Sequence, residues 1–264
     1  MVAVSTSDAV ERAAARLLYA VHNHVTVPPI RDLIGADDVG AAYAVQQKVT
    51  RAWEREGGVV VGRKIGLTSA AVQRQLNVNQ PDFGVLFADM DVSGAAVIPL
   101  SSMLQPRAEA EIAFVLAEDL VDGDLDVGRV REAIGYAVAA VELVDSRIED
   151  WDIALTDTVA DNASSGFLVL AERPCRLDEF APREVRMRMY DGEELVSEGD
   201  GTDCLGDPLA AVLWLARTAR EYGEPLRAGQ IILSGALGPV VPVRAGSTIR
   251  ADIEPLGSVS VEFA

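Results

Sequence analysis

Two glutamates spaced two positions apart are the residues whose pattern first suggests chemistry. Glu109 and Glu111 lie in the segment AEAEIAFVL, residues 108–116, which alternates with the period of a β-strand. Residues i and i+2 of a strand face the same side, so the two carboxylates project together. Adjacent like charges repel unless water or a cation separates them. The pair therefore indicates either a solvated strand face or part of a cation site.

A third carboxylate strengthens the second interpretation. Glu142 lies in the apolar run AAVELV, and a buried glutamate is rarely left unpaired. Together, Glu109, Glu111 and Glu142 could offer three oxygen ligands to a hard divalent ion such as Mg²⁺ or Mn²⁺. The alternative is an ion pair between Glu142 and either Arg107 or Arg147.

Two candidates for proton transfer lie nearer the N-terminus. Lys64 is part of VVVGRKIGL, residues 59–67, where apolar neighbours would lower its pKa and suit it to acid/base work. It could equally extend from a strand edge into water. Asp82 belongs to NQPDFG, residues 79–84, which we expect to form a loop. It is either an acid/base group or a turn residue that follows Pro81.

A polar segment and the scarcity of histidine limit the other possibilities. Asn162, Ser164 and Ser165, in DNASSG, offer neutral hydrogen bonds to a polar ligand or cap a loop. The two histidines, His22 and His24, both lie near the N-terminus, and the chain has two cysteines. Zinc sites of several histidines or of four cysteines are thereby excluded. A bound metal would have to be held by carboxylates.

Composition excludes several classes of partner. The 264 residues include 41 acidic and 23 basic ones, which gives a formal net charge of −18. This balance argues against binding nucleic acid or an anionic membrane surface. No apolar run reaches the ~18 residues of a membrane span, and no secretory signal pattern begins the chain. With two cysteines and no disulfide framework, we expect a cytoplasmic protein.

The elements that must position these residues are of both kinds. The hydrophobic pattern predicts helices over 8–20, 37–56, 69–76 and 207–222, and a helix over 127–140 that continues into 141–144. It predicts strands over 59–67 and 108–116, a hairpin over 185–199, and short strands in the last 35 residues. The expected fold class is α+β, with a mostly helical N-terminal region, 1–70, and a β-rich domain, 71–264. The two could also form one compact unit.

Seven strings of the sequence resemble the 2-keto-4-pentenoate (2-hydroxypenta-2,4-dienoate) hydratases of the fumarylacetoacetate hydrolase superfamily. The similarity runs from about Pro29 to the C-terminus. The strings are VGRKIGLTS (61–69), NQPDFGVLFADM (79–90), LQPRAEAEIAFVL (104–116), SRIEDW (146–151), DTVADNASSG (157–166), CLGDPLAAVLWLAR (204–217) and GEPLRAGQIILSGALGP (223–239).

The resemblance implies a β-rich sandwich or roll that carries a carboxylate metal site. It implies Mg²⁺ or Mn²⁺ on the three glutamates, with Lys64 and Asp82 as active-site groups and the DNASSG loop lining the substrate pocket. It also implies a homo-oligomer, often a pentamer or decamer, that acts in the meta-cleavage degradation of aromatic compounds.

The expected reaction is hydration of a small 2-hydroxydienoic or 2-oxo acid, 2-hydroxypenta-2,4-dienoate, to 4-hydroxy-2-oxopentanoate. We expect Lys64 and Asp82 to move protons or position water, and Arg63 or Lys64 to help attract the anionic substrate. One alternative is a 4-oxalocrotonate decarboxylase, whose second substrate carboxylate would need an extra cationic contact. Another is a hydratase for a longer-chain dienoate. A non-catalytic binding protein is disfavoured because every candidate ligand is retained.

Overall fold

Helices form the N-terminal end of the molecule. The structure is a computed structural model that describes residues 6–69, 73, 78, 80–95 and 97–264. The first elements are α1 (Thr6–Asn23), α2 (Arg31–Ile34) and α3 (Val39–Arg55). The Asp38 side chain accepts a hydrogen bond from the Ala41 N–H and so caps α3. The helices predicted over 8–20 and 37–56 are therefore confirmed.

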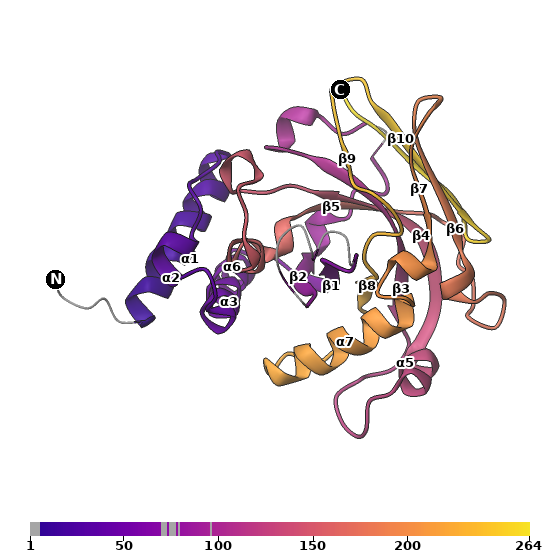
Figure 1. Ribbon diagram of the computed structural model, residues 1–264, viewed down its shortest axis with the longest axis horizontal. Coiled ribbons are helices and arrows are strands. Elements are labelled where there is room, and N and C mark those ends of the chain that lie inside the picture. The colour runs from indigo at the N-terminus through magenta and orange to yellow at the C-terminus, as the bar shows by residue number, and fades with distance from the viewer. Residues whose placement is uncertain (1–5, 70–72, 74–77, 79, 96) are drawn as a thin grey trace.

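A mixed sheet is the centre of the fold, and it curls into a half-barrel (Figure 1). Its strand order is β2-β1-β8-β3-β4-β5, with β9 paired to β3; β1 and β8 run parallel and the other pairs antiparallel. The strands are β1 (Val60–Gly66), β2 (Asp82–Phe87), β3 (Arg107–Leu116), β4 (Ile134–Val144), β5 (Ser165–Leu170), β8 (Ile231–Leu233) and β9 (Val241–Pro242). This sheet draws on residues from both sides of position 70, where the sequence predicts a domain boundary.

A second sheet packs beside the first. It is antiparallel, with the order β11-β10-β6-β7. The strands are β6 (Arg186–Asp191), β7 (Glu194–Asp200), β10 (Thr248–Glu254) and β11 (Gly257–Glu262). The predicted hairpin is β6–β7, and Gly192 takes the positive φ of 60° that its turn requires. β10 and β11 contact β4, so the main hydrophobic core lies between the two sheets.

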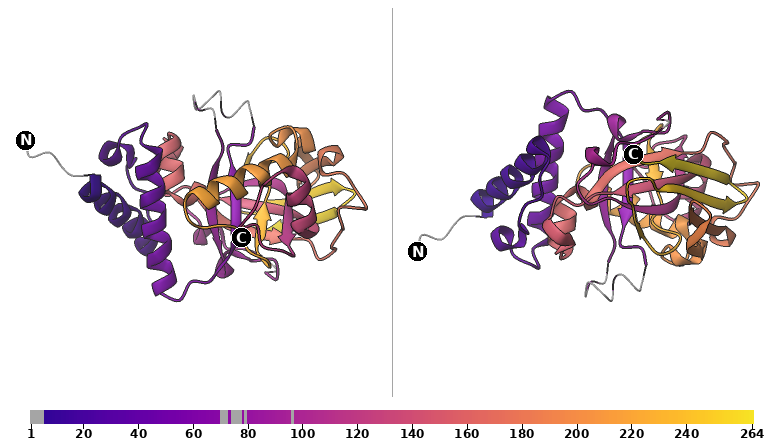
Figure 2. Two further views of the ribbon diagram at one scale, coloured as in Figure 1. Left: turned by 90° about the horizontal axis from the view of Figure 1, so that it is seen from below. Right: turned by 90° about the horizontal axis from the view of Figure 1, so that it is seen from above.

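Three helices that follow β3 in the chain, α5, α6 and α7, complete the α+β fold. α7 (Pro208–Glu221) confirms the helix predicted over 207–222; it is capped by the Asp207 side chain and packs with α5 (Val127–Ala133) against the sheets. α6 (Leu155–Ala160) lies beside α3, so a late segment joins the N-terminal helices at one end of the molecule (Figure 2). No helix among the described residues is both long and apolar enough to cross a membrane.

One predicted helix is wrong beyond its first two turns. The helical pattern over 127–140 ends at Ala133, and Ile134–Val144 form β4. The alanines at 137, 139 and 140 favour a helix locally, but β4 pairs with β3 on one side and β5 on the other. A strand buried on both faces shows no alternation, so pairing with its neighbours decides its structure.

The loop predicted around Asp82 is also wrong. Asp82 opens β2, where it pairs with Gly66 of β1. Pro81 directly precedes the strand, a position at which its missing N–H removes no ladder hydrogen bond. Most of the short helix predicted over 69–76 lies outside the described residues.

Candidate active site

Three carboxylates meet at the centre of the large sheet. Glu109 and Glu111 face the same side of β3, and Glu142 of β4 pairs directly with Glu109 across the antiparallel ladder. One carboxylate oxygen from each residue lies within 4.8 Å of the other two. Glu111 and Glu142 are fully buried and Glu109 is half-buried. The strand period thus brings together the three residues that the sequence suggested as ligands.

The carboxylate cluster lacks the partners that buried charges require. Glu111 Oε1 and Glu142 Oε2 accept no hydrogen bond from any described residue, while Glu111 Oε2 accepts one from the Gly235 N–H at 2.8 Å. Burial is the main cause that raises the pKa of Glu109 to about 7 and also raises the pKa values of Glu111 and Glu142; repulsion from neighbouring glutamates adds to the shift at Glu109 and Glu111. Three converging hard oxygens with unmet acceptor capacity fit a divalent cation such as Mg²⁺ or Mn²⁺.

Lys64 is buried beside this cluster rather than extended from a strand edge. Its side chain is on β1, the residue is 2% exposed, and Nζ lies 3.1 Å from Glu142 Oε1. Nζ also donates a 3.0 Å hydrogen bond to the carbonyl oxygen of Ala163. Burial alone lowers the lysine pKa, but the surrounding carboxylates outweigh it and raise the pKa. In the metal-free chain the shift is thus opposite to the lowering expected from the apolar neighbours, and the charged form of Lys64 is favoured.

Asp82 faces the same point as Lys64. A Cβ added at Gly66 would lie 2.2 Å from Asp82 Oδ1 and 3.5 Å from Lys64 Nζ. This crowding explains why the GRKIGL string has glycine at position 66. Thr158 Oγ1 donates to Asp82 Oδ2 at 3.1 Å, whereas burial, the dominant effect, raises the pKa of the carboxyl. Thr158 is a neighbour of the site that the sequence did not indicate.

The DNASSG segment forms one wall of the site. Two of its polar side chains are hydrogen-bonded within the described part of the protein and a third is not. The Asn162 amide exchanges two hydrogen bonds with the backbone of Val85, at 2.7 and 2.9 Å. Ser165 Oγ donates to the Asn162 carbonyl at 2.7 Å. Both side chains therefore stabilise the loop, which was the alternative to ligand binding. The buried Ser164 Oγ has no hydrogen-bond partner among the described residues.

The backbone of this loop has an unusual conformation. Asn162, Ala163 and Ser164 all have positive φ values, 55°, 50° and 53°. L-residues rarely adopt this left-handed region, and each costs about 1 kcal/mol or more unless other contacts impose it. The consequence is that the Ala163 carbonyl points at Lys64.

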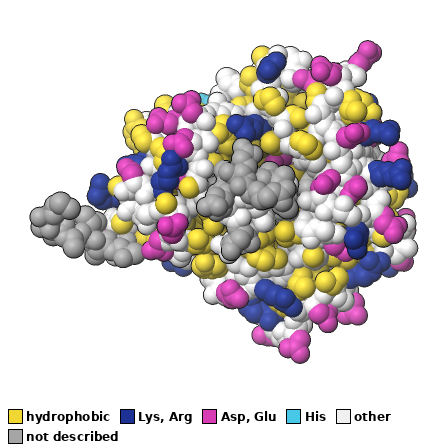
Figure 3. Space-filling model, viewed as in Figure 1, with side chains coloured by type: hydrophobic (Ala, Val, Ile, Leu, Met, Phe, Trp, Pro, Cys, Tyr) yellow, Lys and Arg dark blue, Asp and Glu magenta, His cyan; other side chains and the backbone are white. Residues whose placement is uncertain are grey.

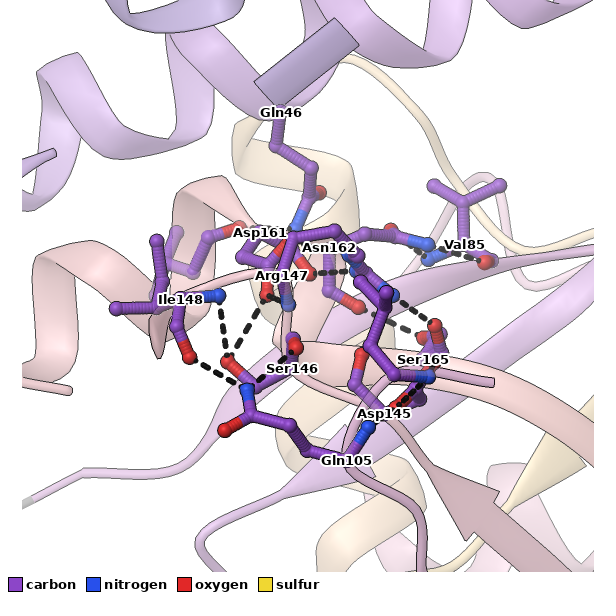
Figure 4. Close-up of polar contacts among 12 residues, drawn as sticks. Gln46, Val85, Gln105, Asp145, Ser146, Arg147, Ile148, Asp161, Asn162 and Ser165 are labelled. Carbon is purple, nitrogen blue, oxygen red and sulfur yellow. Dashed lines mark hydrogen bonds and ion pairs between the residues drawn. The ribbon is translucent and has the colours of Figure 1, made fainter. Parts of the chain in front are cut away.

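A buried arginine imposes that conformation (Figure 4). Arg147 Nε donates to Asp161 Oδ1 at 2.5 Å, and Nη1 donates to the carbonyls of Asp145 and Ser165 at 2.7 and 2.5 Å. Nη2 donates to the Asp161 carbonyl. The sequence suggested Arg147 or Arg107 as a partner of Glu142, which is wrong for both. Arg147 holds the loop, and the guanidinium of Arg107 lies 4.2 Å from the centre of the Trp151 ring.

Arg63 does not join the carboxylate cluster. Successive residues of a strand face opposite sides, so Arg63 lies on the face of β1 that is turned away from Lys64. There it lines a separate cavity between the sheet and α3. The structure therefore does not bring Arg63 together with the other predicted site residues.

Comparisons with known proteins agree with the sequence strings. The family profile for the fumarylacetoacetate (FAA) hydrolase C-terminal region matches residues 59–264. The protein named TodF product hydratase from Pseudomonas putida is 52% identical over 258 residues, which are 98% of this chain and 96% of the relative. The 2-keto-4-pentenoate hydratase 1 of Dechloromonas aromatica is 49% identical over 96% of this chain and 97% of its own.

A solved structure has the same fold over its whole length. The 4-oxalocrotonate decarboxylase from Pseudomonas putida G7, complexed with magnesium and adipate, matches with a TM-score of 0.93. It is 32% identical, and the match covers 99% of each chain. The resemblance drawn from the sequence strings is confirmed.

Proposed function

Because this chain belongs to the fumarylacetoacetate hydrolase family, and within it to the 2-keto-4-pentenoate hydratases, we propose that it hydrates 2-hydroxypenta-2,4-dienoate to 4-hydroxy-2-oxopentanoate. The reaction belongs to the meta-cleavage degradation of aromatic compounds. The observation that carries the proposal is the convergence of three carboxylates, with unmet acceptor capacity, next to a buried ammonium group.

Glu109, Glu111 and Glu142 are the residues that would hold the metal, Mg²⁺ or Mn²⁺. When bound, such an ion supplies Lewis-acid polarisation of a 2-oxo acid. The chain itself supplies the shape: β3 and β4 fix the three carboxylates on adjacent ladder positions, and the Gly235 N–H orients Glu111. A site held by sheet residues stays in position through the reaction.

Lys64 and Asp82 are the residues that would stabilise charge and transfer protons during the reaction. In the net reaction, C5 gains a proton as the dienol becomes the 2-oxo-3-enoate; water oxygen then adds to C4 and a proton to C3. Lys64, an ammonium held by Glu142 and Ala163, would stabilise negative charge on the conjugated substrate. Asp82, whose pKa is raised by burial, is the carboxyl group that would give and take the protons. Ser164 Oγ is the one hydroxyl of the loop that is available to the substrate or to water.

Decarboxylation of 4-oxalocrotonate is the second candidate, favoured by the similarity to the solved decarboxylase. Its substrate has a further carboxylate, which requires a free cation. Of the cations near the site that the structure describes, Lys64 is already paired with Glu142, Arg63 lies on the other face of β1, and Arg107 stacks on Trp151. These contacts favour hydration over decarboxylation. Turnover of a panel of dienoates of different length would identify the preferred substrate.

The test is direct. The purified chain with Mg²⁺ or Mn²⁺ is mixed with freshly made 2-hydroxypenta-2,4-dienoate, the loss of diene absorbance is followed, and products are identified by mass spectrometry. We expect metal-dependent hydration without release of CO₂. Glu142→Gln should abolish turnover and Mg²⁺ binding, while Glu193→Gln, at an exposed turn between β6 and β7, serves as the matched control. Turnover confined to 4-oxalocrotonate, with CO₂ release, would replace the hydratase by the decarboxylase.

We further propose that the chain assembles as a homo-oligomer, a pentamer or decamer. The family resemblance supports this assembly. Mass measurement in solution, by analytical ultracentrifugation or native mass spectrometry, tests it.

A further inference from the structure

A second cavity lies on the face of β1 opposite the carboxylates. It has a volume of about 280 Å³ and is enclosed by α3, by β1 and β2, and by the segment that follows α7. Its lining includes the cations Arg51 and Arg63, the carboxylates Glu54 and Glu224, and the aromatic side chains of Tyr43, Phe83 and Tyr222. Nothing in the proposed hydration uses this space.

The feature that indicates a ligand is the state of Arg63. The residue is 6% exposed, yet its Nε has no hydrogen-bond partner among the described residues. Nη1 donates only to the carbonyl of the neighbouring Gly62, at 3.0 Å. Nη2 lies 3.8 Å from Glu224 Oε2, too far for a hydrogen bond, and the Glu224 side chain is 53% exposed.

Arg147 provides the internal comparison. That guanidinium is equally buried, and Nε, Nη1 and Nη2 all donate to protein acceptors. Buried polar groups are almost always satisfied in this way, because an unpaired charge away from water is strongly unfavourable. Arg63 therefore has donors left over for an acceptor that enters the cavity.

The residues that line the cavity indicate the kind of ligand that would carry this acceptor group. Tyr43 stacks on Phe83 with ring centroids 4.7 Å apart, and Tyr222 lies 4.3 Å from Tyr43. Arg51 adds a second cation at the cavity, and the described residues offer its side chain no ion pair. A guanidinium fork matches the two oxygens of a carboxylate, and aromatic walls favour a flat apolar body.

We propose that this cavity binds a small carboxylate anion with a flat, apolar body, of about the size of benzoate. Arg63 is its principal contact, and Glu224 is the exposed anion that it displaces. The site is independent of the proposed reaction, because Arg63 and Lys64 point to opposite faces of the same strand.

Calorimetric titration of the full-length, Mg²⁺-loaded protein with benzoate tests the proposal. We expect saturable binding that Arg63→Met weakens by about ten- to a hundredfold, the loss expected for a charge-assisted contact. Arg63→Lys, which keeps the charge but not the fork, should also weaken it. Glu224→Gln should tighten it, because the competing carboxylate is removed. Arg55→Met, an equal charge change at an exposed site on α3 outside the cavity lining, is the matched control and should leave it unchanged.

Two comparisons separate this site from the carboxylate cluster and from simple charge attraction. Glu111→Gln should leave benzoate binding intact, and acetate, which lacks the ring, should bind more weakly than benzoate. Binding lost in Glu111→Gln but kept in Arg63→Met would place the anion at the carboxylate cluster and overturn the proposal. Absence of binding at millimolar benzoate would overturn it too. Replacing a buried charge whose donors are only partly satisfied by Met is not expected to unfold the chain, and the melting temperature of each variant checks this.

Discussion

At the scale of single residues, the site depends on one positive charge among four carboxylates. Lys64 contacts Glu142 and the Ala163 carbonyl, and the charges of Glu109, Asp82 and Glu111 also raise its pKa. In the metal-free chain these carboxylates favour the charged form of the lysine. The ammonium group would offer the substrate a fixed positive charge and a hydrogen-bond donor.

Lys64→Met should separate catalysis from metal binding. We expect turnover to fall by about a hundredfold or more, since a positioned polar group is lost. Mg²⁺ affinity should not fall, because the lysine charge opposes a cation rather than holding it. Steady-state kinetics and Mg²⁺ titration measure the two effects, with Lys48→Met, at an exposed ion pair, as the control. A large loss of Mg²⁺ affinity would show instead that Lys64 maintains the arrangement of the glutamates.

Residue types and spacing predicted much of this site, and the errors have physical causes. The two-residue period placed Glu109 and Glu111 on one face, and the buried run around Glu142 supplied the third carboxylate. The same period, applied to Arg63 and Lys64, would have shown that neighbours in a strand cannot serve one site. The pKa of Lys64 was beyond prediction, because its local neighbours are apolar and the charges come from other strands.

At the scale of elements, the loop between α6 and β5 depends on a single arginine. Arg147 joins the chain before this loop to Asp161 and Ser165 within it (Figure 4). Elements of this kind are difficult to predict, because the contacts connect segments that have no shared periodicity. The β4 strand shows the same limit: alanine-rich residues favoured a helix until pairing with β3 and β5 was known.

Arg147→Lys should loosen this loop. Lysine keeps the charge but cannot reach several carbonyls at once, and disrupting such a buried pair costs about 3 kcal/mol of unfolding free energy. We expect a lower melting temperature together with reduced turnover, because the Ala163 carbonyl no longer fixes Lys64. Thermal denaturation and kinetics test this against Arg129→Lys, a change at a surface pair with Glu118. Equal effects of the two substitutions would contradict the role of the loop network.

At the scale of the whole molecule, acidic residues outnumber basic ones and the two kinds are interspersed on the face shown in Figure 3. The buried cluster contributes to the proton balance of folding. Burial raises the pKa of Glu109 to about 7 from the ordinary 4.5, and Glu111 and Glu142 shift in the same direction. Between about pH 4.5 and pH 7 the folded state therefore binds more protons than the unfolded state.

The metal-free protein should therefore lose stability as pH rises. A carboxyl group whose pKa is raised by folding adds to the free energy of unfolding. For Glu109 this stabilisation is fully present below about pH 4.5 and is lost as the pH rises through 7. Mg²⁺ requires the ionised carboxylates, so it should raise the melting temperature more at about pH 8 than at about pH 5.5, and release protons on binding. Scanning calorimetry with and without Mg²⁺ measures this. Glu109→Gln should flatten the pH dependence, and an equal shift at both pH values would contradict the assignment.

The Ala163 carbonyl has a consequence for the evolution of this protein. One of the two groups that hold the buried ammonium is a peptide oxygen, which is present whatever side chain stands at position 163. Selection there acts on backbone shape, because the residue must tolerate a φ of 50°. Glycine, asparagine or alanine can be exchanged among lineages at little cost, whereas valine or isoleucine is selected against. A change of side chain at position 163 would thus leave the contact with Lys64 in place.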